Sequence, residues 1–193
     1  LFFLHEQLRK EPRVESTLAA LQRQGLWHDV HEIKETLKQL MTRLDLSSQI
    51  KARDELTYHN NDSLKIISEA ATKLKQLPQN HPQYSQLFIM GGSVLSSTGA
   101  LPEAENLLVQ VKKMAPNDSD RALAAFNLFQ VRVRSGDFKQ ALTALQEAIS
   151  IEPQRFSLHD VEKYPIKQIL GAGGMGCVFL CSNPPASLYS LRF

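Results

Sequence analysis

Cysteine is scarce in this sequence, and long apolar runs are missing from it. The 193 residues include two cysteines, Cys177 and Cys181. Four positions along an extended strand, at about 3.3 Å each, would separate them by roughly 13 Å, which is beyond the reach of a disulfide. No apolar run approaches the roughly 18 residues that a membrane helix needs, and the apolar start at 1–4 is too short for a signal peptide. We therefore expect a disulfide-free, cytoplasmic chain with no membrane contact in this segment.

Clusters of one charge and sets of metal ligands are also missing. The 22 Lys and Arg residues are interspersed with 20 Asp and Glu residues, for a net charge of +2. A nucleic-acid-binding domain usually gathers its basic residues on one face, so we expect no nucleic-acid partner. His28 and His31 have no cysteine or carboxylate at the spacing of a zinc site, and we expect no metal site. Because the chain begins at Leu1 and ends at Phe193 within an apolar run, we expect it to be a fragment.

Helical periodicity dominates the chain as far as about Ile151. Apolar residues recur there at intervals of three and four, which is the period of an α-helix. Proline and glycine fall mainly where such helices would end. The first half predicts two helical hairpins, one of 15–24 and 30–44, divided at Gly25, and one of 47–58 and 62–77, ended by Pro78.

Two further hairpins repeat each other with a period of 37 residues. The glycine, alanine and proline landmarks share this spacing: Gly99 and Gly136, Ala104 and Ala141, Pro116 and Pro153. In each unit the glycine ends the first helix, and the small alanine lets the second helix pack closely. This pattern resembles the tetratricopeptide repeat, whose period is about 34 residues. The clearest units are 85–118 and 122–155, whereas the two earlier pairs match only in their helix-turn-helix outline.

The repeat resemblance implies a mainly α fold for residues 1–155. Such helical hairpins stack into a solenoid with a concave groove, because a single pair cannot bury its apolar face alone. We expect this groove to bind a peptide or a partner protein. The alternative is that the helices act as a spacer or brace for the residues that follow.

The pattern changes in residues 156–193. After a linker at 156–161, residues 164–170 alternate like a strand, a glycine-rich stretch follows, and strand-like residues return at 178–181 and 188–193 around a turn. Pro184 and Pro185 leave no room for a helix after Gly176, which excludes a dinucleotide-binding unit. The absence of Gly-Lys-Ser/Thr excludes a Walker loop.

The glycine-rich stretch Leu170-Gly-Ala-Gly-Gly-Met-Gly-Cys-Val178 matches G-x-G-x-x-G-x-V in full. With a strand on each side, it resembles the glycine loop in the small lobe of a protein kinase, especially of the bacterial type of serine/threonine kinase. The resemblance implies that the glycines shape the loop over the phosphates of ATP and that Leu170 and Val178 pack on the adenine. The expected ATP-binding residues are Leu170, Gly171, Ala172, Gly173, Gly174, Met175, Gly176, Cys177, Val178 and Arg192.

Arg192 marks a departure from the family pattern. Aligning 189–192 with the V-A-I-K motif puts Arg192 at the position of the lysine that binds the α and β phosphates. The planar guanidinium does not replace a compact ammonium between phosphate and carboxylate, which puts catalysis in doubt. The alternative is that the last dozen residues align in another register.

The catalytic residues of the family, and those that hold Mg²⁺, would follow the end of this chain. We therefore expect no catalytic residue here and no kinase activity from this chain alone. The favoured interpretation is a fragment of a serine/threonine protein kinase that phosphorylates a protein substrate. The alternative is a non-catalytic scaffold with a vestigial pseudokinase tail. The short strand piece should leave Phe179, Leu191 and Phe193 exposed.

Overall fold

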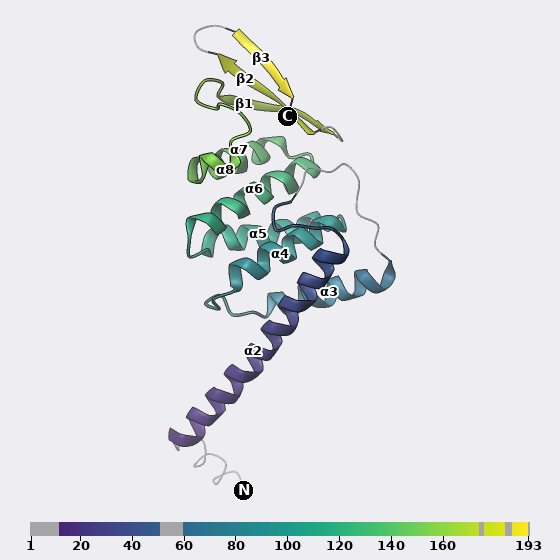
Figure 1. The fold of residues 1–193 in the computed structure, drawn as a ribbon, viewed down its shortest axis with the longest axis vertical. Coiled ribbons are helices and arrows are strands. Elements are labelled where there is room, and N and C mark those ends of the chain that lie inside the picture. Colours follow the sequence, from purple (N-terminus) through teal and green to yellow (C-terminus); the bar gives the residue numbers. More distant parts are fainter. Residues whose placement is uncertain (1–11, 51–59, 174–175, 184–186, 193) are drawn as a thin grey trace.

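The computed structural model describes the backbone of residues 12–50, 60–173, 176–183 and 187–192. These residues form a mainly helical stack with a small antiparallel sheet at one end (Figure 1). The helices are α2 (Pro12–Arg43), α3 (Asn61–Lys75), α4 (Tyr84–Ser97), α5 (Leu101–Met114), α6 (Asp118–Arg134), α7 (Phe138–Ile151) and α8 (Pro153–Phe156). The strands are β1 (Ile166–Gly173), β2 (Gly176–Asn183) and β3 (Ser187–Arg192).

Helix α2 is one continuous helix of 32 residues, so the predicted division at Gly25 is wrong. Glycine within a helix costs only about 1 kcal/mol relative to alanine, and the helix continues into a half that is buried at Val30, Ile33 and Leu37. The burial of that half favours continuation of the helix. Figure 1 shows the other half of α2 projecting away from the stack.

Helix α2 ends in a tight turn that sequence periodicity did not indicate. Asp45 adopts a left-handed backbone with φ of 50°, and the Leu46 N–H donates to the Met41 carbonyl oxygen at 2.8 Å. This arrangement is the hydrogen-bond pattern of a Schellman helix end. Residues 47–50 are not helical, contrary to the predicted helix at 47–58, whose remainder lies outside the described residues. Helix α3 matches the predicted helix 62–77 to within two residues at either end, and it packs against α2 and α4.

The two hairpins related by 37 residues have the same local geometry. Gly99 and Gly136 end α4 and α6 with φ of 83° and 80°, a conformation that side chains with a Cβ rarely adopt. In both hairpins the N–H two residues after the glycine donates to its carbonyl oxygen. Ala104 and Ala141 are both fully buried. The spacing found in the sequence thus relates two equivalent structural units.

Helix α6 lies inside the stack, in contact with α4, α5 and α7 (Figure 1). Its alanines at 122, 124 and 125 are fully buried, and their small side chains let neighbouring helices approach closely. Ion pairs join the helices at the edges of these contacts. Arg132 Nε lies 2.8 Å from Glu105 Oε1, and Lys112 Nζ lies 2.7 Å from Glu147 Oε2.

The three strands form an antiparallel sheet in the order β1-β2-β3. One face packs against the helices and buries five side chains, namely Ile166, Ile169, Cys177, Phe179 and Cys181. The rings of Phe179 and of Phe129 on α6 have centroids 6.3 Å apart. The expected exposure of Phe179 is therefore wrong, because the helical stack covers this face of the sheet. The side chains of Leu191 and Phe193 lie outside the described residues.

Candidate functional site

The glycine-rich stretch forms the tip of the hairpin between β1 and β2. Gly173 pairs with Gly176 across the strands, so the connection has two residues, Gly174 and Met175, which lie outside the described residues. Gly176, the first residue after this connection, has φ of 107°, a conformation that residues with a Cβ rarely adopt. The strands therefore extend further into the glycine stretch than the sequence pattern predicted.

The predicted ATP-binding residues divide between the two faces of this hairpin. Cys177 is buried with Phe179 against the helices, whereas Val178 stands between them in β2 and is half-buried. Because successive residues of a strand point to opposite faces, Val178 belongs to the face away from the helices. Leu170 is 48% exposed and lies at an irregularity in the β1–β2 pairing. Leu170 and Val178 thus leave apolar surface open to solvent, while Cys177 can offer a ligand only its backbone.

Gly171 has no structural reason to be a glycine. Its φ is outside the left-handed region, and a Cβ built there meets no described atom within 4 Å. Gly92 in α4 differs, because its Cβ would stand 3.0 Å from the side chain of Leu108. Gly171 is half-buried, and Ala172 and Gly173 are exposed. The open space over Gly171 lets a ligand approach the backbone closely.

The charge of the sheet region has one sign. Residues 166–192 include Lys167 and Arg192 and no aspartate or glutamate. The β2–β3 register places the backbone of Arg192 directly opposite Val178, and the side chain of Arg192 lies outside the described set. A region of this composition attracts anions such as phosphates. Since it offers no carboxylate, it has no side chain of the kind that Mg²⁺ prefers.

The two cysteines lie on the buried face of the sheet, where only Cys181 contacts His159, and neither forms a reactive site. Burial raises the pKa of both thiols above the ordinary value of 9.0. Cys181 Sγ lies 3.8 Å from His159 Nε2, which in turn lies 2.7 Å from the Tyr164 carbonyl oxygen. The thiolate is the nucleophilic form of cysteine, so buried thiols with raised pKa values are poor nucleophiles.

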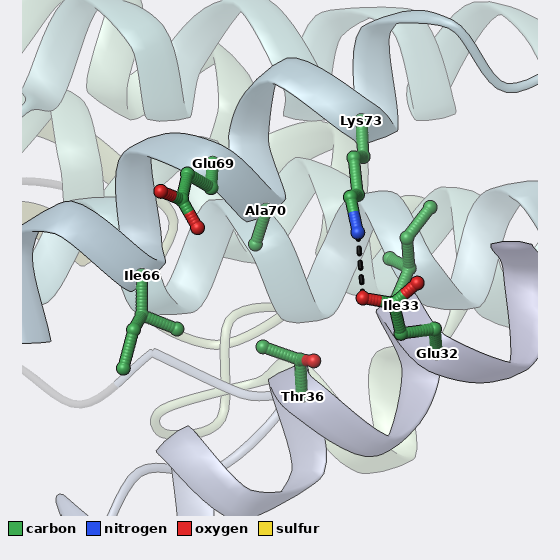
Figure 2. Close-up of a pocket in the computed structure, with 7 residues that line it drawn as sticks. All are labelled: Glu32, Ile33, Thr36, Ile66, Glu69, Ala70 and Lys73. Atoms are coloured by element: carbon green, nitrogen blue, oxygen red, sulfur yellow. Dashed lines mark hydrogen bonds and ion pairs between the residues drawn. The ribbon is translucent and has the colours of Figure 1, made fainter.

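A shallow pocket of about 90 Å³ lies between α2 and α3 (Figure 2). It is lined by Glu32, Ile33, Thr36, Ile66, Glu69, Ala70 and Lys73. Lys73 Nζ pairs with Glu32 Oε1 at 2.7 Å, and this contact lowers the pKa of Glu32 and raises that of Lys73. Ligand pockets usually measure about 300–1,000 Å³, so this one is too small for a nucleotide or a similar ligand.

Sequence periodicity missed a polar site on α4 and α6. Asn127 is fully buried and Ser93 is nearly so, although both lie in helices that are otherwise mostly apolar on their buried sides. Their side chains hydrogen-bond to the segment that follows α2. The available signal was an amide side chain in the middle of an apolar helix, which does not by itself reveal a partner far away in the sequence.

The described residues show neither a metal-ligand cluster nor a membrane-spanning helix. They contain no group of three or more histidine, cysteine, aspartate or glutamate side chains placed to hold a metal ion. None of their helices is both long and apolar enough to cross a membrane.

The chain matches no protein-family model, no curated protein and no solved structure.

Proposed function

We propose that the β1–β2 hairpin is the ATP-phosphate loop of a serine/threonine protein kinase, preceded by tetratricopeptide-like repeats that bind a partner protein. The observation that carries the nucleotide role is the open space at Gly171. It is a glycine that neither backbone conformation nor packing requires, within a motif where close approach to phosphates is the usual reason for glycine.

In this proposal each part of the hairpin has a separate role. The backbone N–H groups of 171–173 that face away from β2, on the outer edge of the sheet, donate to the phosphates, and the apolar surface of Leu170 and Val178 receives the adenine. Arg192, opposite Val178 in the register, supplies positive charge. Mg²⁺ would neutralise the charge that develops on the transferred phosphoryl group, and because this sheet region has no carboxylate, its protein ligands would come from elsewhere in the full-length protein.

A second candidate is a non-catalytic scaffold whose hairpin is a pseudokinase remnant. Arg192 at the expected lysine position favours it, because the two cations are not interchangeable between phosphate and carboxylate. The full-length sequence distinguishes the candidates. An H-R-D-x-x-x-x-N motif followed by D-F-G supports the enzyme, and the absence of both supports the scaffold.

The nucleotide role can be tested by titrating MgATP into the isotope-labelled chain and following its backbone amide resonances. We expect the resonances of 170–178 to shift with a Kd in the millimolar range, about −4 kcal/mol, since the hairpin forms only part of a nucleotide site. The Gly171→Ala substitution should weaken binding roughly tenfold and leave the free energy of unfolding nearly unchanged, because the added methyl enters open space.

Gly25→Ala is the matched control, since this glycine also has no described atom within 4 Å of a Cβ but lies in α2. It should bind MgATP as the unmodified chain does. If Gly171→Ala binds equally well, or if the shifts are scattered over the helices, the hairpin is not a phosphate loop.

A further inference from the structure

The segment that follows α2 lies on α4 and α6 and is held there through its backbone. Ser93 Oγ donates to the Ser47 carbonyl oxygen at 2.6 Å. Asn127 Nδ2 donates to the Ser48 carbonyl oxygen at 2.7 Å, and Asn127 Oδ1 accepts from the Ile50 N–H at 2.8 Å. Figure 1 shows this segment crossing the helices after the end of α2.

These contacts recognise an extended main chain rather than particular polar side chains. One amide side chain engages the carbonyl of residue 48 and the N–H of residue 50. The side chains of Ser47, Ser48 and Gln49 are exposed, whereas Ile50 is 6% exposed. The segment therefore combines backbone hydrogen bonds with one apolar anchor, as short peptides do when bound in a groove.

The surface beneath the segment is polar where a helix core would normally be apolar. Asn127 is 0% exposed, and Gln130, one turn further along α6, has a buried Oε1 that accepts no hydrogen bond from any described residue. An unpaired buried acceptor costs about 1–3 kcal/mol. An apolar residue at 130 would avoid this cost, so the acceptor of Gln130 is available to a donor from outside the described residues.

We propose that this surface of Ser93, Asn127 and Gln130 is a binding site for an extended peptide of a partner protein, and that Ser47–Ile50 occupies it in the free chain as an internal competitor. The partner peptide carries a branched aliphatic residue at the position of Ile50 and a further donor that reaches Gln130. This inference rests on the partner-binding role proposed for the helices and is independent of the ATP-binding role of the hairpin.

Native-state hydrogen exchange tests whether the internal segment can be displaced. The Ile50 amide is bound only to a side chain in the structure described, so it should exchange through local opening, at least about tenfold faster than the amide of Leu128 in the core of α6. Exchange of both amides at one rate, through global unfolding, would show that 47–50 is an integral part of the fold and would overturn the proposal.

Binding in trans tests the site itself. The probe is a fluorescein-labelled peptide with the sequence of residues 45–52, measured by fluorescence anisotropy. Ile50→Ser in the chain removes the internal anchor, and we expect the peptide to bind this variant about tenfold more tightly than the unmodified chain.

Two further variants, made in the Ile50→Ser chain, distinguish binding at the proposed site from non-specific binding to the surface that Ile50→Ser uncovers. Asn127→Leu keeps the number and branching of the side-chain heavy atoms but removes both hydrogen bonds, and Ser93→Ala is the milder change should Asn127→Leu fail to fold. Each should weaken the peptide, and neither should alter the MgATP-induced shifts of the hairpin. The proposal is wrong if the peptide binds no variant, if it binds all of them equally, or if the Ile50→Ser chain dimerises and leaves the peptide free.

Discussion

At the scale of single residues, burial determines the chemistry of Cys177 and Cys181. Both are free thiols on the face of the sheet that packs against the helices. Removal from water disfavours the charged thiolate, which raises the pKa of each thiol in the folded chain above the 9.0 of an exposed cysteine. At alkaline pH the folded chain therefore keeps the protons of its two thiols, whereas the unfolded chain loses them.

This difference predicts slow alkylation and a loss of stability in alkali. A group whose pKa is raised on folding contributes stability that is fully present below the unfolded pKa, here 9.0, and lost as pH rises through the folded value. Iodoacetamide at a pH of about 8 should modify the folded chain at least tenfold more slowly than the urea-unfolded chain, because the neutral thiol is unreactive. Mass spectrometry of timed samples measures both rates.

The control is a chain with both cysteines replaced by serine. Its unfolding midpoint should fall less steeply above pH 9.0 than that of the unmodified chain, whatever its stability at neutral pH. Equal alkylation rates in the folded and unfolded chains would mean that the sheet face is open to solvent.

At the scale of elements, two glycines with equal space around them have different backbone conformations. A Cβ at Gly25 or at Gly136 meets no described atom within 4 Å. Gly25 lies within α2, where alanine is the better helix former by about 1 kcal/mol. Gly136 has φ of 80°, a conformation that a residue with a Cβ adopts at a cost of roughly 1–2 kcal/mol.

The same substitution should therefore have opposite effects at the two positions. Gly25→Ala should raise the free energy of unfolding by up to about 1 kcal/mol, and Gly136→Ala should lower it by about 1 kcal/mol or more. Urea titrations of the two variants and the unmodified chain measure both changes. A destabilising Gly25→Ala would mean that α2 is interrupted at residue 25.

These helices and strands show which features of the fold could be predicted from the sequence and which could not. Helices α4 to α7 could be predicted because a glycine with positive φ ends the first helix of each hairpin, and the strands could be predicted from their alternation. The predicted helix end at 44 lies one residue from the observed end of α2 at Arg43. The turn that follows could not be predicted, because Asp45 takes a left-handed conformation that aspartate adopts only occasionally. The contact of Asn127 with Ile50 joins residues 77 positions apart, which no local pattern encodes. In the β1–β2 hairpin, the spacing of the glycines predicted a ligand-binding loop. Only the structure showed that Cys177 is buried against the helices and that Val178 faces away from them.

At the scale of the whole molecule, the sheet and the helices share one apolar core. Phe179 in the middle strand is fully buried, and its ring centroid lies 6.3 Å from that of Phe129 of α6. Strand β1 also contacts α7. A three-stranded sheet gains much of its stability from packing against a helix layer, and here that layer is the second of the two equivalent hairpins. We therefore expect the helices and the sheet to unfold together.

Phe179→Ala tests this coupling. Truncating a buried phenylalanine usually costs about 3–5 kcal/mol, which in a chain of this size lowers Tm by roughly 10 °C. The far-ultraviolet circular dichroism of the chain comes mainly from its helices, so a shift of that signal reports destabilisation of the helical stack by a change in the sheet. Leu170→Ala is the control in the same sheet, because Leu170 is 48% exposed and its loss should change the free energy of unfolding by less than about 0.5 kcal/mol. If Phe179→Ala leaves the helical transition in place, the sheet is a separate folding unit, and its open face would have to bind any nucleotide without support from the helices.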